Sequence, residues 1–319
     1  MLNQYHHLPS SFPTVPTEGT QWAAHQERCE QPQRAAPTPP GESCFTSNDA
    51  TNQPQRAAPP GPTSNDAPQT NNNALPGTIN THPKPLSRAN IQIATLNVNG
   101  RASSSHPTRG PVSKWTNIHR VMREKKIDIL CLQETHLENE HINQIHNLFG
   151  RRMLVINSAT PNSPGATGGV AFVINKECLS YLSTETFEIT PGRALLLTVA
   201  RPNDRQLTLL NIYAPNAPHA HPTFWNEIQN KIPRQRSPDI VLGDFNLTED
   251  PIDRAPAHTD NEPAAEALKI FKESLNIRDV WRHENPDTRL FTFSSSNGSL
   301  SRLDRIYTRH SLTNALFNW

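Results

Sequence analysis

The chain has 319 residues, 30 prolines and a formal net charge of +1 at pH 7. The length suits one large domain or two smaller ones, and no lysine- or arginine-rich block indicates binding through bulk positive charge. The four cysteines show no CxxC spacing, and no apolar segment resembles a secretory signal or a membrane span. These features exclude a disulfide framework and that kind of zinc site, and they predict an intracellular protein, nuclear or cytoplasmic, that is not secreted and has no membrane partner.

The first 88 residues differ in composition from the rest of the chain. They hold half of the prolines, and they repeat "QPQRAAP" at 31–37 and 53–59 and "TSNDA" at 46–50 and 63–67. Large apolar side chains are scarce, so this stretch cannot bury enough surface to offset the entropy of ordering it. We therefore predict a disordered Pro/Asn/Thr-rich tail over 1–88 and a folded domain over 89–319.

The first half of the folded part alternates strands and helices. The segment "IQIATLNVNG" at 91–100 is typical of a strand that ends in a loop, and apolar residues at helical spacing predict a helix over 115–126. The nearly continuous apolar run "IDILCLQET" at 127–135 predicts a strand that is buried on both faces. A second helix is expected to end near Gly150, and strands are expected over 151–159 and 168–175.

The second half predicts a hairpin over 193–215, a helix from about Pro222, a strand over 239–246 and a helix over 264–275. Two more strands are expected around the Asn-Gly turn of "RLFTFSSSNGSLSRLDRIYTR". This order is not a pure alternation of strand and helix. It favours a layered α/β sandwich with mixed or antiparallel sheets.

Polar residues mark the ends of several predicted strands. The apolar run 240–242 is followed by Asp244 and Asn246, which share one face of an extended chain, while Phe245 can enter the core. A carboxylate beside an amide suits metal, water or phosphate chemistry, although a surface Asx turn explains the same pair. Other strand ends carry Asn97, Glu134, Tyr213 and Asp304. We expect all six side chains to meet at one edge of the sandwich.

Five segments in order, "TLNVNG", "LCLQET", "NIYAPN", "GDFN" and "SRLDRIY", resemble the endonuclease/exonuclease/phosphatase superfamily. The resemblance extends from residue 91 to 307 and implies a deoxyribonuclease-I-like four-layer α/β sandwich with two packed mixed sheets flanked by helices. The more specific motifs "LQETH", "DVWR" and "FTFSSS" look most like those of the apurinic-type endonuclease domain of non-LTR (LINE-like) retrotransposons. DNA is the partner that this resemblance implies. No protein partner is indicated.

The resemblance also implies a role for each polar strand end. Glu134 would be the main ligand of Mg²⁺, with Mn²⁺ as the alternative ion, and Asn97 would lie beside the metal and hold that carboxylate. Asp244 would activate the attacking water, while Asn246 and Tyr213 would contact the scissile phosphate or the leaving oxygen. Asp304 would hold a histidine that stabilises charge in the transition state. We further expect contacts with substrate from Asn211, Arg302 and Phe293.

The family's final motif, a Ser-Asp-His type tripeptide on a last strand, has no counterpart here. Only 15 residues (319 − 304) follow Asp304, and they contain no Asp-His pair. We therefore expect a C-terminally truncated domain that lacks its last strand and whose activity is impaired. Three functions stay open: a Mg²⁺-dependent DNA endonuclease, a catalytically inactive remnant with the nuclease fold, and a phosphatase or phosphodiesterase of the same superfamily.

Overall fold

The computed structural model describes residues 2–4, 90–100, 111–179, 184–201 and 205–315. The chain divides into two units, and Met1–Glu27 together with Pro83–Trp319 forms the unit that contains all of these residues. The second unit, Arg28–His82, lies outside the described part. The predicted tail can therefore be compared with the structure only at Leu2–Gln4, which forms strand β1. Residues 5–88 of that prediction lie outside the described residues.

The first sheet has five strands in the order β1-β2-β3-β5-β4. Strands β1, β2 and β3 are parallel, whereas β5 is antiparallel to both β3 and β4. The bounds of the strands after β1 are β2 Ile93–Asn97, β3 Ile129–Gln133, β4 Met153–Ser158 and β5 Val170–Asn175. The parallel pair β2–β3 brings the ends of two predicted strands to the same edge.

The second sheet has six strands in the order β11-β14-β9-β8-β7-β6, and only the pair β8–β9 is parallel. Its strands are β6 Thr184–Thr190, β7 Ala194–Ala200, β8 Gln206–Tyr213, β9 Ile240–Asp244, β11 Ile277–Asp279 and β14 Asp304–Arg309. Since β14 runs antiparallel to β9, the beginning of β14 lies beside the end of β9.

A third, small sheet corrects one expectation about the C-terminal segment. We predicted two strands around the Asn-Gly turn. The structure has three strands in this segment: β12 and β13 on the two sides of the turn, and β14 after them. Strands β12 Phe293–Ser294 and β13 Leu300–Ser301 pair with each other, and β13 also pairs with β10 Arg254–Ala255. The segment that follows enters the large sheet as β14. The second predicted strand is therefore divided into β13 and β14, which belong to different sheets, because the chain leaves the hairpin at residues 302–303.

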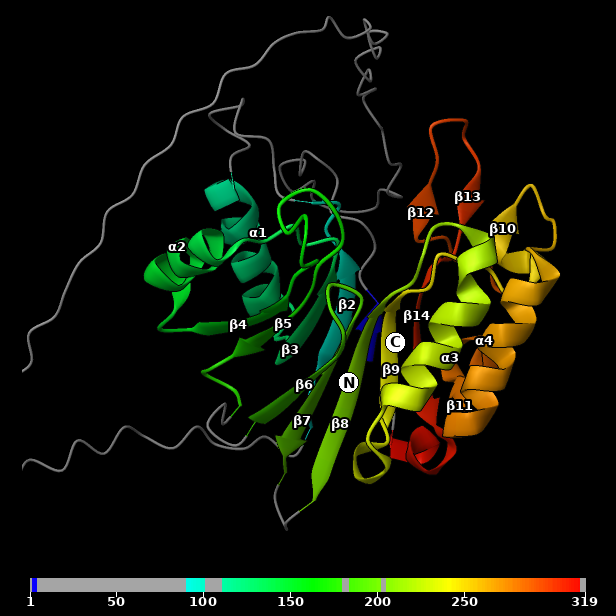
Figure 1. Cartoon of the computed structure of the whole chain (residues 1–319). Coiled ribbons are helices and arrows are strands. Elements are labelled where there is room, and N and C mark those ends of the chain that lie inside the picture. Colours follow the sequence, from blue (N-terminus) through cyan, green and yellow to red (C-terminus); the bar gives the residue numbers. More distant parts are fainter. Residues whose placement is uncertain (1, 5–89, 101–110, 180–183, 202–204, 316–319) are drawn as a thin grey trace, which may run out of the picture. The chain divides into compact units, whose positions relative to one another are not determined.

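Helices cover the outer faces of both large sheets, as Figure 1 shows. Helices α1 Pro111–Glu124 and α2 Asn139–Phe149 pack on the first sheet. Helices α3 His221–Lys231 and α4 Glu262–Leu275 pack on the second, and α5 Val280–Glu284 follows β11. The described residues also include the short 3₁₀ helices η2 Pro218–Ala220, η3 Arg234–Arg236, η4 Pro251–Asp253 and η5 His310–Ala315. The predicted four-layer α/β sandwich is confirmed.

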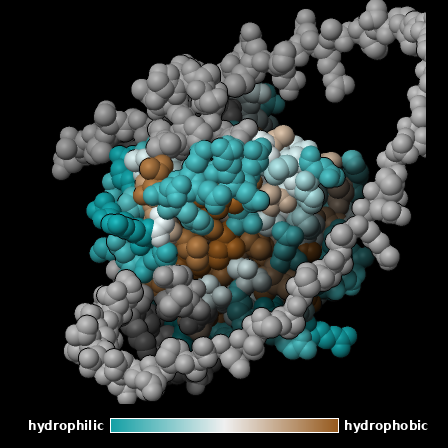
Figure 2. Space-filling view, turned by 60° about the vertical axis from the view of Figure 1, so that its left-hand side comes forward, coloured by the Kyte–Doolittle hydropathy of each residue, from teal (hydrophilic) through white to brown (hydrophobic). Residues whose placement is uncertain are grey.

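Apolar side chains fill all three spaces between the layers. Phe172, Leu197 and Leu242 belong to the central core between the sheets, and each is 0% exposed. Burial of one such side chain contributes about 1.5–3 kcal/mol to the free energy of folding. Runs such as "ILCLQ" have no polar face because both faces of these strands are covered. In Figure 2 a hydrophobic area lies in the middle of a largely hydrophilic face. Among the described helices, none combines the length and the apolar character that crossing a membrane requires.

Candidate active site

Two strand ends from different sheets meet through the side chain of Asn97. Asn97 ends β2 of the first sheet, and Asp244 ends β9 of the second. The Asn97 amide nitrogen donates hydrogen bonds to Glu134 Oε1 and to Asp244 Oδ2, both at 2.8 Å. Asn97 and Asp244 are 3% and 4% exposed, so these bonds lie inside the sandwich. One amide therefore fixes two carboxylates relative to each other.

Glu134 occupies a backbone conformation that few residues other than glycine adopt. It directly follows β3 and has a φ of 51°. Such a left-handed conformation costs roughly 1–2 kcal/mol, so it persists only where neighbours hold it. Its carbonyl accepts from the Gly100 amide at 2.7 Å, and the next amide, of Thr135, donates to the Gly169 carbonyl at 3.1 Å. A strained acidic residue at a strand end is a typical feature of functional sites.

Gly243 allows the second sheet to bring three candidate residues side by side. Its φ is 139°, and a Cβ atom would lie 2.0 Å from the Ile212 carbonyl oxygen. The next residue, Asp244, is in register with Tyr213 of β8 on one side and with Asp304 of β14 on the other. The glycine in "GDFN" is thus required for the close approach of β8 and β9 at the site.

The turn after β9 places Asn246 beside Tyr213. The Asn246 backbone amide donates to Asp244 Oδ1 at 2.9 Å, and its φ is 47°, so the chain turns here. The Asn246 side-chain amide donates to the Ala214 carbonyl at 2.9 Å and to Asn216 Oδ1 at 3.3 Å. The Tyr213 hydroxyl donates to the same oxygen at 3.3 Å. The Asx-type bond that we considered as an alternative is present, and it forms part of the site.

Phe245 lies between the two polar residues and enters the core, as the alternation of the sequence predicted. It is 0% exposed, stacks on Trp225 with ring centroids 5.7 Å apart, and meets Tyr307 edge-on at 4.8 Å. This packing fixes the backbone between Asp244 and Asn246.

Asp304 begins its strand rather than ending it, which corrects the expectation. The backbone amides of Leu303 and Asp304 donate to Thr292 Oγ1 at 2.9 and 3.0 Å. Asp304 is 3% exposed, and within the described part of the chain its Oδ1 has no hydrogen-bond partner. No described histidine hydrogen-bonds to Asp304, and the late His310 instead lies exposed in η5 with its amide on the Asn276 carbonyl.

Burial and the charge of a neighbouring acid raise the pKa values of Asp244 and Asp304. Burial raises the pKa of Asp244 to about 6, and the negative charge of Glu134 adds to the rise against hydrogen bonds from Asn246 and Asn97. Burial, then the charge of Asp244, raises the pKa of Asp304 well above its usual range. The pKa of the Tyr213 hydroxyl is also raised, mainly by burial and by Glu134. Such a cluster favours a bound proton or a bound cation.

The donor set fits one divalent cation held mainly by Glu134. Mg²⁺ needs only one or two protein carboxylates, because waters and phosphate oxygens complete its coordination. No cluster of three or more His, Cys, Asp or Glu side chains suited to a metal occurs in the described ranges. Asn97 Oδ1 already accepts the Asn99 amide at 2.8 Å. The Asn97 amide nitrogen is thus placed to orient Glu134.

Two of the three residues expected to contact substrate are fully buried. Asn211 is 0% exposed, and its amide donates to the Leu132 and Ala171 carbonyls, both at 3.0 Å. Its oxygen accepts from Gln133 Nε2 at 2.6 Å, so Asn211 links the two large sheets. Arg302 is 1% exposed within an ion-pair network, and Phe293 is half-buried in β12. We therefore assign Asn211 and Arg302 to the scaffold, because both side chains are buried and make hydrogen bonds inside the protein.

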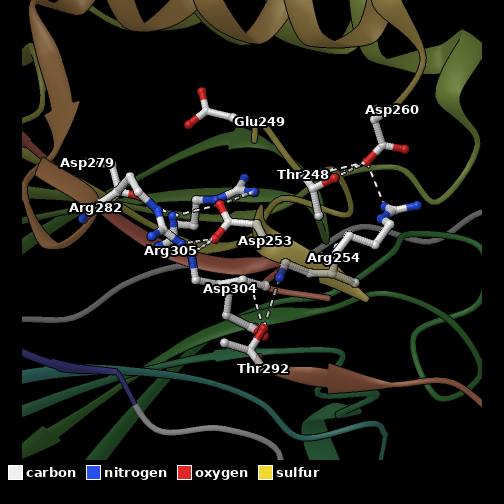
Figure 3. A network of polar contacts seen from close by, with 12 residues as sticks. Thr248, Glu249, Asp253, Arg254, Asp260, Asp279, Arg282, Thr292, Asp304 and Arg305 are labelled. Atoms are coloured by element: carbon white, nitrogen blue, oxygen red, sulfur yellow. Dashed lines mark hydrogen bonds and ion pairs between the residues drawn. The ribbon is translucent and has the colours of Figure 1, made fainter. Parts of the chain in front are cut away.

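Figure 3 shows a network of polar contacts around Asp253 that includes Asp279, Arg282 and Arg305. With Arg302 these residues form what we call the arginine cluster: Asp253, Asp279, Arg282, Arg302 and Arg305. Arg302 donates to Asp253 from Nε at 2.8 Å and from Nη2 at 3.0 Å, and Nη2 also donates to Asp279 at 2.6 Å. Arg282 donates to Asp253 as well, and Arg305 Nη2 lies 3.9 Å from it. The cluster ties η4, β11, α5 and β14 together next to Asp304.

Sequence reasoning missed two residues that complete the site. Asn216 accepts from both Tyr213 and Asn246, and Thr292 binds the backbone at Asp304. Each lies in a segment that carried the resemblance, Asn216 at the end of "NIYAPN" and Thr292 in "FTFSSS". Neither ends a predicted strand in the sequence pattern, so the strand-end argument could not single them out.

The chain thus combines a four-layer α/β sandwich with buried acids, amides and a tyrosine at neighbouring strand ends. The chain belongs to the Endonuclease/Exonuclease/phosphatase family, which matches residues 94–316.

Two curated relatives align with part of the chain. The "Transposon TX1 uncharacterized 149 kDa protein" of Xenopus laevis is 30% identical over 223 residues, which are 68% of this chain and 16% of that protein. The mouse (Mus musculus) "DNA-(apurinic or apyrimidinic site) endonuclease 2" is 27% identical over 227 residues, which are 57% of this chain and 42% of that protein. The chain thus spans less than half the length of either relative.

Solved structures share the fold. An AP endonuclease from Leishmania major has a TM-score of 0.54 at 17% identity, covering 69% of this chain and 79% of that one. An AP endonuclease from Archaeoglobus fulgidus has a TM-score of 0.50 at 22% identity, covering 70% of this chain and 88% of that one.

Proposed function

We propose that the domain over 89–319 is a DNA endonuclease that depends on a divalent cation and derives from a non-LTR retrotransposon. The observation that carries the proposal is the Asn97 amide, which joins Glu134 and Asp244 at 2.8 Å each. This unit holds one carboxylate for a cation and a second carboxylate for a water. The names of the relatives, a transposon protein and an apurinic-site endonuclease, support DNA as the substrate.

Each residue of the site has a part in phosphodiester hydrolysis. Glu134 would hold Mg²⁺ or Mn²⁺, and the bound ion would neutralise charge on the phosphate oxygens. Asp244 takes the proton of the attacking water as the new oxygen–phosphorus bond forms, and the bond to the leaving sugar oxygen breaks. The Asn246 amide and the Tyr213 hydroxyl exchange their bonds to Asn216 for bonds to phosphate oxygens. These donors act on charge that develops in the transition state.

Asp304 supports a second candidate, an impaired or inactive remnant. Its Oδ1 is buried without a hydrogen-bond partner among the described residues. The resemblance implies that Asp304 holds a histidine whose imidazolium donates a hydrogen bond to the phosphate. Loss of one such donor costs on the order of 10²–10³ in rate. We therefore propose slow nicking.

Nicking of supercoiled plasmid by the full chain tests the proposal. Reactions with Mg²⁺, with Mn²⁺ and with chelator are compared for the wild type, Glu134→Ala and the control Asn230→Ala, which alters an exposed residue of α3. A duplex with one abasic site and a small phosphodiester complete the substrate panel. Nicking that needs metal and disappears only in Glu134→Ala supports the endonuclease. A folded wild type inactive in every arm indicates the remnant, and cleavage of the small ester alone indicates a phosphodiesterase.

A further inference from the structure

Lys114 reaches from helix α1 to the loop that follows β2. Its Nζ donates to two backbone carbonyls of this loop, those of Val98 and Gly100. The residue is half-buried, so both contacts lie partly away from water. One ammonium group therefore satisfies two carbonyls and fixes the distance between the helix and the loop.

The same loop holds the backbone of Glu134. The amides of Val98 and Gly100 donate to the carbonyls of Gln133 and Glu134 at 3.0 and 2.7 Å. Lys114 binds the carbonyls of the two residues whose amides hold this strand end. A displacement of the loop would thus be transmitted directly to Glu134.

The loop has little room to adjust. Asn99 and Gly100 have φ angles of 49° and 70°, close to the 51° of Glu134. A Cβ atom on Gly100 would lie 2.6 Å from the His136 Nδ1 atom. Asn99 and Glu134 are left-handed residues other than glycine on the two sides of the contact, so external bonds such as those of Lys114 help to hold them.

The charge of Lys114 lies within the field of the site. Burial lowers the pKa of Lys114 to about 8, and the negative charge of Glu134 opposes this shift. The ammonium and the carboxylate therefore interact although no direct hydrogen bond joins them. A purely structural link between helix and loop is the competing explanation, and it predicts no specific effect on cation binding.

We propose that Lys114 is a positioning residue for Glu134: by holding the Val98–Gly100 loop, it keeps the Glu134 carboxylate in place to bind the cation. The inference rests on the proposed function, because it assigns Glu134 to the metal. Groups that orient metal ligands typically change metal affinity or activity by about 10–100-fold when they are removed.

Mn²⁺ binding to the full chain, measured by calorimetry, tests the proposal without relying on activity. Lys114→Met keeps the length of the side chain and removes the donor, and Lys125→Met alters an exposed lysine just after α1 as the control. We expect about 10-fold or greater weakening of Mn²⁺ binding in Lys114→Met and none in Lys125→Met. Lys114→Arg, which retains charge and donors, should recover most of the affinity. If Lys114→Met does not fold, Lys114→Gln takes its place with an intermediate loss expected.

A double-mutant cycle on nicking separates positioning from a structural role. If Lys114 acts through Glu134, Lys114→Met should cost the wild type at least about tenfold and the Glu134→Gln variant less than about twofold. Equal losses in both backgrounds, or a lower melting temperature with unchanged Mn²⁺ affinity, would overturn the proposal. If the wild type and Lys114→Met bind Mn²⁺ and nick DNA equally well, the role proposed for Lys114 is refuted and the proposed function is not. A folded wild type that does neither refutes the proposed function as well.

Discussion

Two buried polar clusters lie next to each other around strand β14, and they differ in whether their acids are paired with arginines. Asp304 and Arg305 are neighbours that point to opposite faces of this strand. The following pair shows the same alternation, since Ile306 packs in the central core and Tyr307 in the outer one. The site containing Asp304 is rich in acids, whereas the arginine cluster on the Arg305 side pairs its acids with guanidinium groups.

The pKa values express this difference. Burial alone would raise the pKa of Asp253, but hydrogen bonds and charge from Arg302 lower it overall. Burial raises the pKa of Asp244 to about 6, and the charge of Arg305 opposes this rise less than the other causes do. A cluster in which each acid is paired with a guanidinium group serves the scaffold, whereas one that leaves acids unpaired is suited to an external cation. The arginine cluster should therefore control stability, and the acidic site should control activity.

The largest effect is expected from breaking the arginine cluster. Asp253→Ala would leave Arg302 and Arg282 buried without their shared partner, and loss of one member of a buried ion pair costs about 3–5 kcal/mol. For a domain of this size the melting temperature should fall by on the order of 10 °C. Asp287→Ala, at an exposed acid after α5, serves as the control for thermal unfolding. Equal melting temperatures for both variants would show that the cluster does not support the fold.

Substitutions in the acidic site should lower nicking and leave stability unchanged. Glu134→Ala removes the main candidate ligand, so nicking should fall by at least about 10²–10³-fold. Its stability should not fall, because the substitution removes a negative charge that raises the pKa of Asp244. Nicking and thermal unfolding are measured on the same preparation, with Asn230→Ala alongside. A Glu134→Ala variant that melts much earlier than the wild type would contradict the distinction between the clusters.

Sequence reasoning found the fold and most strand ends because both depend on local pattern. The run "IDILCLQET" can only be a strand with both faces covered, and its polar end then has to lie at the edge of the sheet. The functions of Asn211 and Arg302 could not be predicted, because burial by the opposite sheet or by Asp253 depends on residues far away in the chain. The same holds for Asn216 and Thr292, whose partners become neighbours only through folding.

Gly243 sharpens the comparison at the level of the backbone. Gly243→Ala would place a Cβ atom 2.0 Å from the Ile212 carbonyl at a φ of 139°. Strain of this kind costs about 1–3 kcal/mol, and β9 would have to shift by moving Asp244. We expect moderate loss of stability together with a larger loss of nicking. Denaturant unfolding and plasmid nicking are compared with those of Gly298→Ala, which has a φ of 83° but no atom within 4 Å of its Cβ. Equal losses of activity in the two variants would argue against a special role for the close approach of β8 and β9.

The smallest effect concerns pH and the raised pKa of Asp244, which is about 6 in the folded chain against an ordinary value of 3.8. As a base, Asp244 acts when it is deprotonated, so nicking should fall about tenfold per pH unit below this pKa and level off above it. A bound cation stabilises the carboxylate, and the midpoint should then shift to lower pH as Mg²⁺ is raised.

Stability should change in the opposite direction over the same range. Between about pH 4 and 6 the folded chain holds the Asp244 proton more tightly than the unfolded chain does, so the free energy of unfolding decreases as pH rises. Asp244→Asn should reduce this slope in the presence of chelator, while Asp287→Asn should leave it unchanged. Part of the slope should remain in Asp244→Asn, because Asp304 also has a raised pKa. Denaturant unfolding at several pH values gives both slopes, and identical slopes for the wild type and Asp244→Asn would show that burial does not raise this pKa.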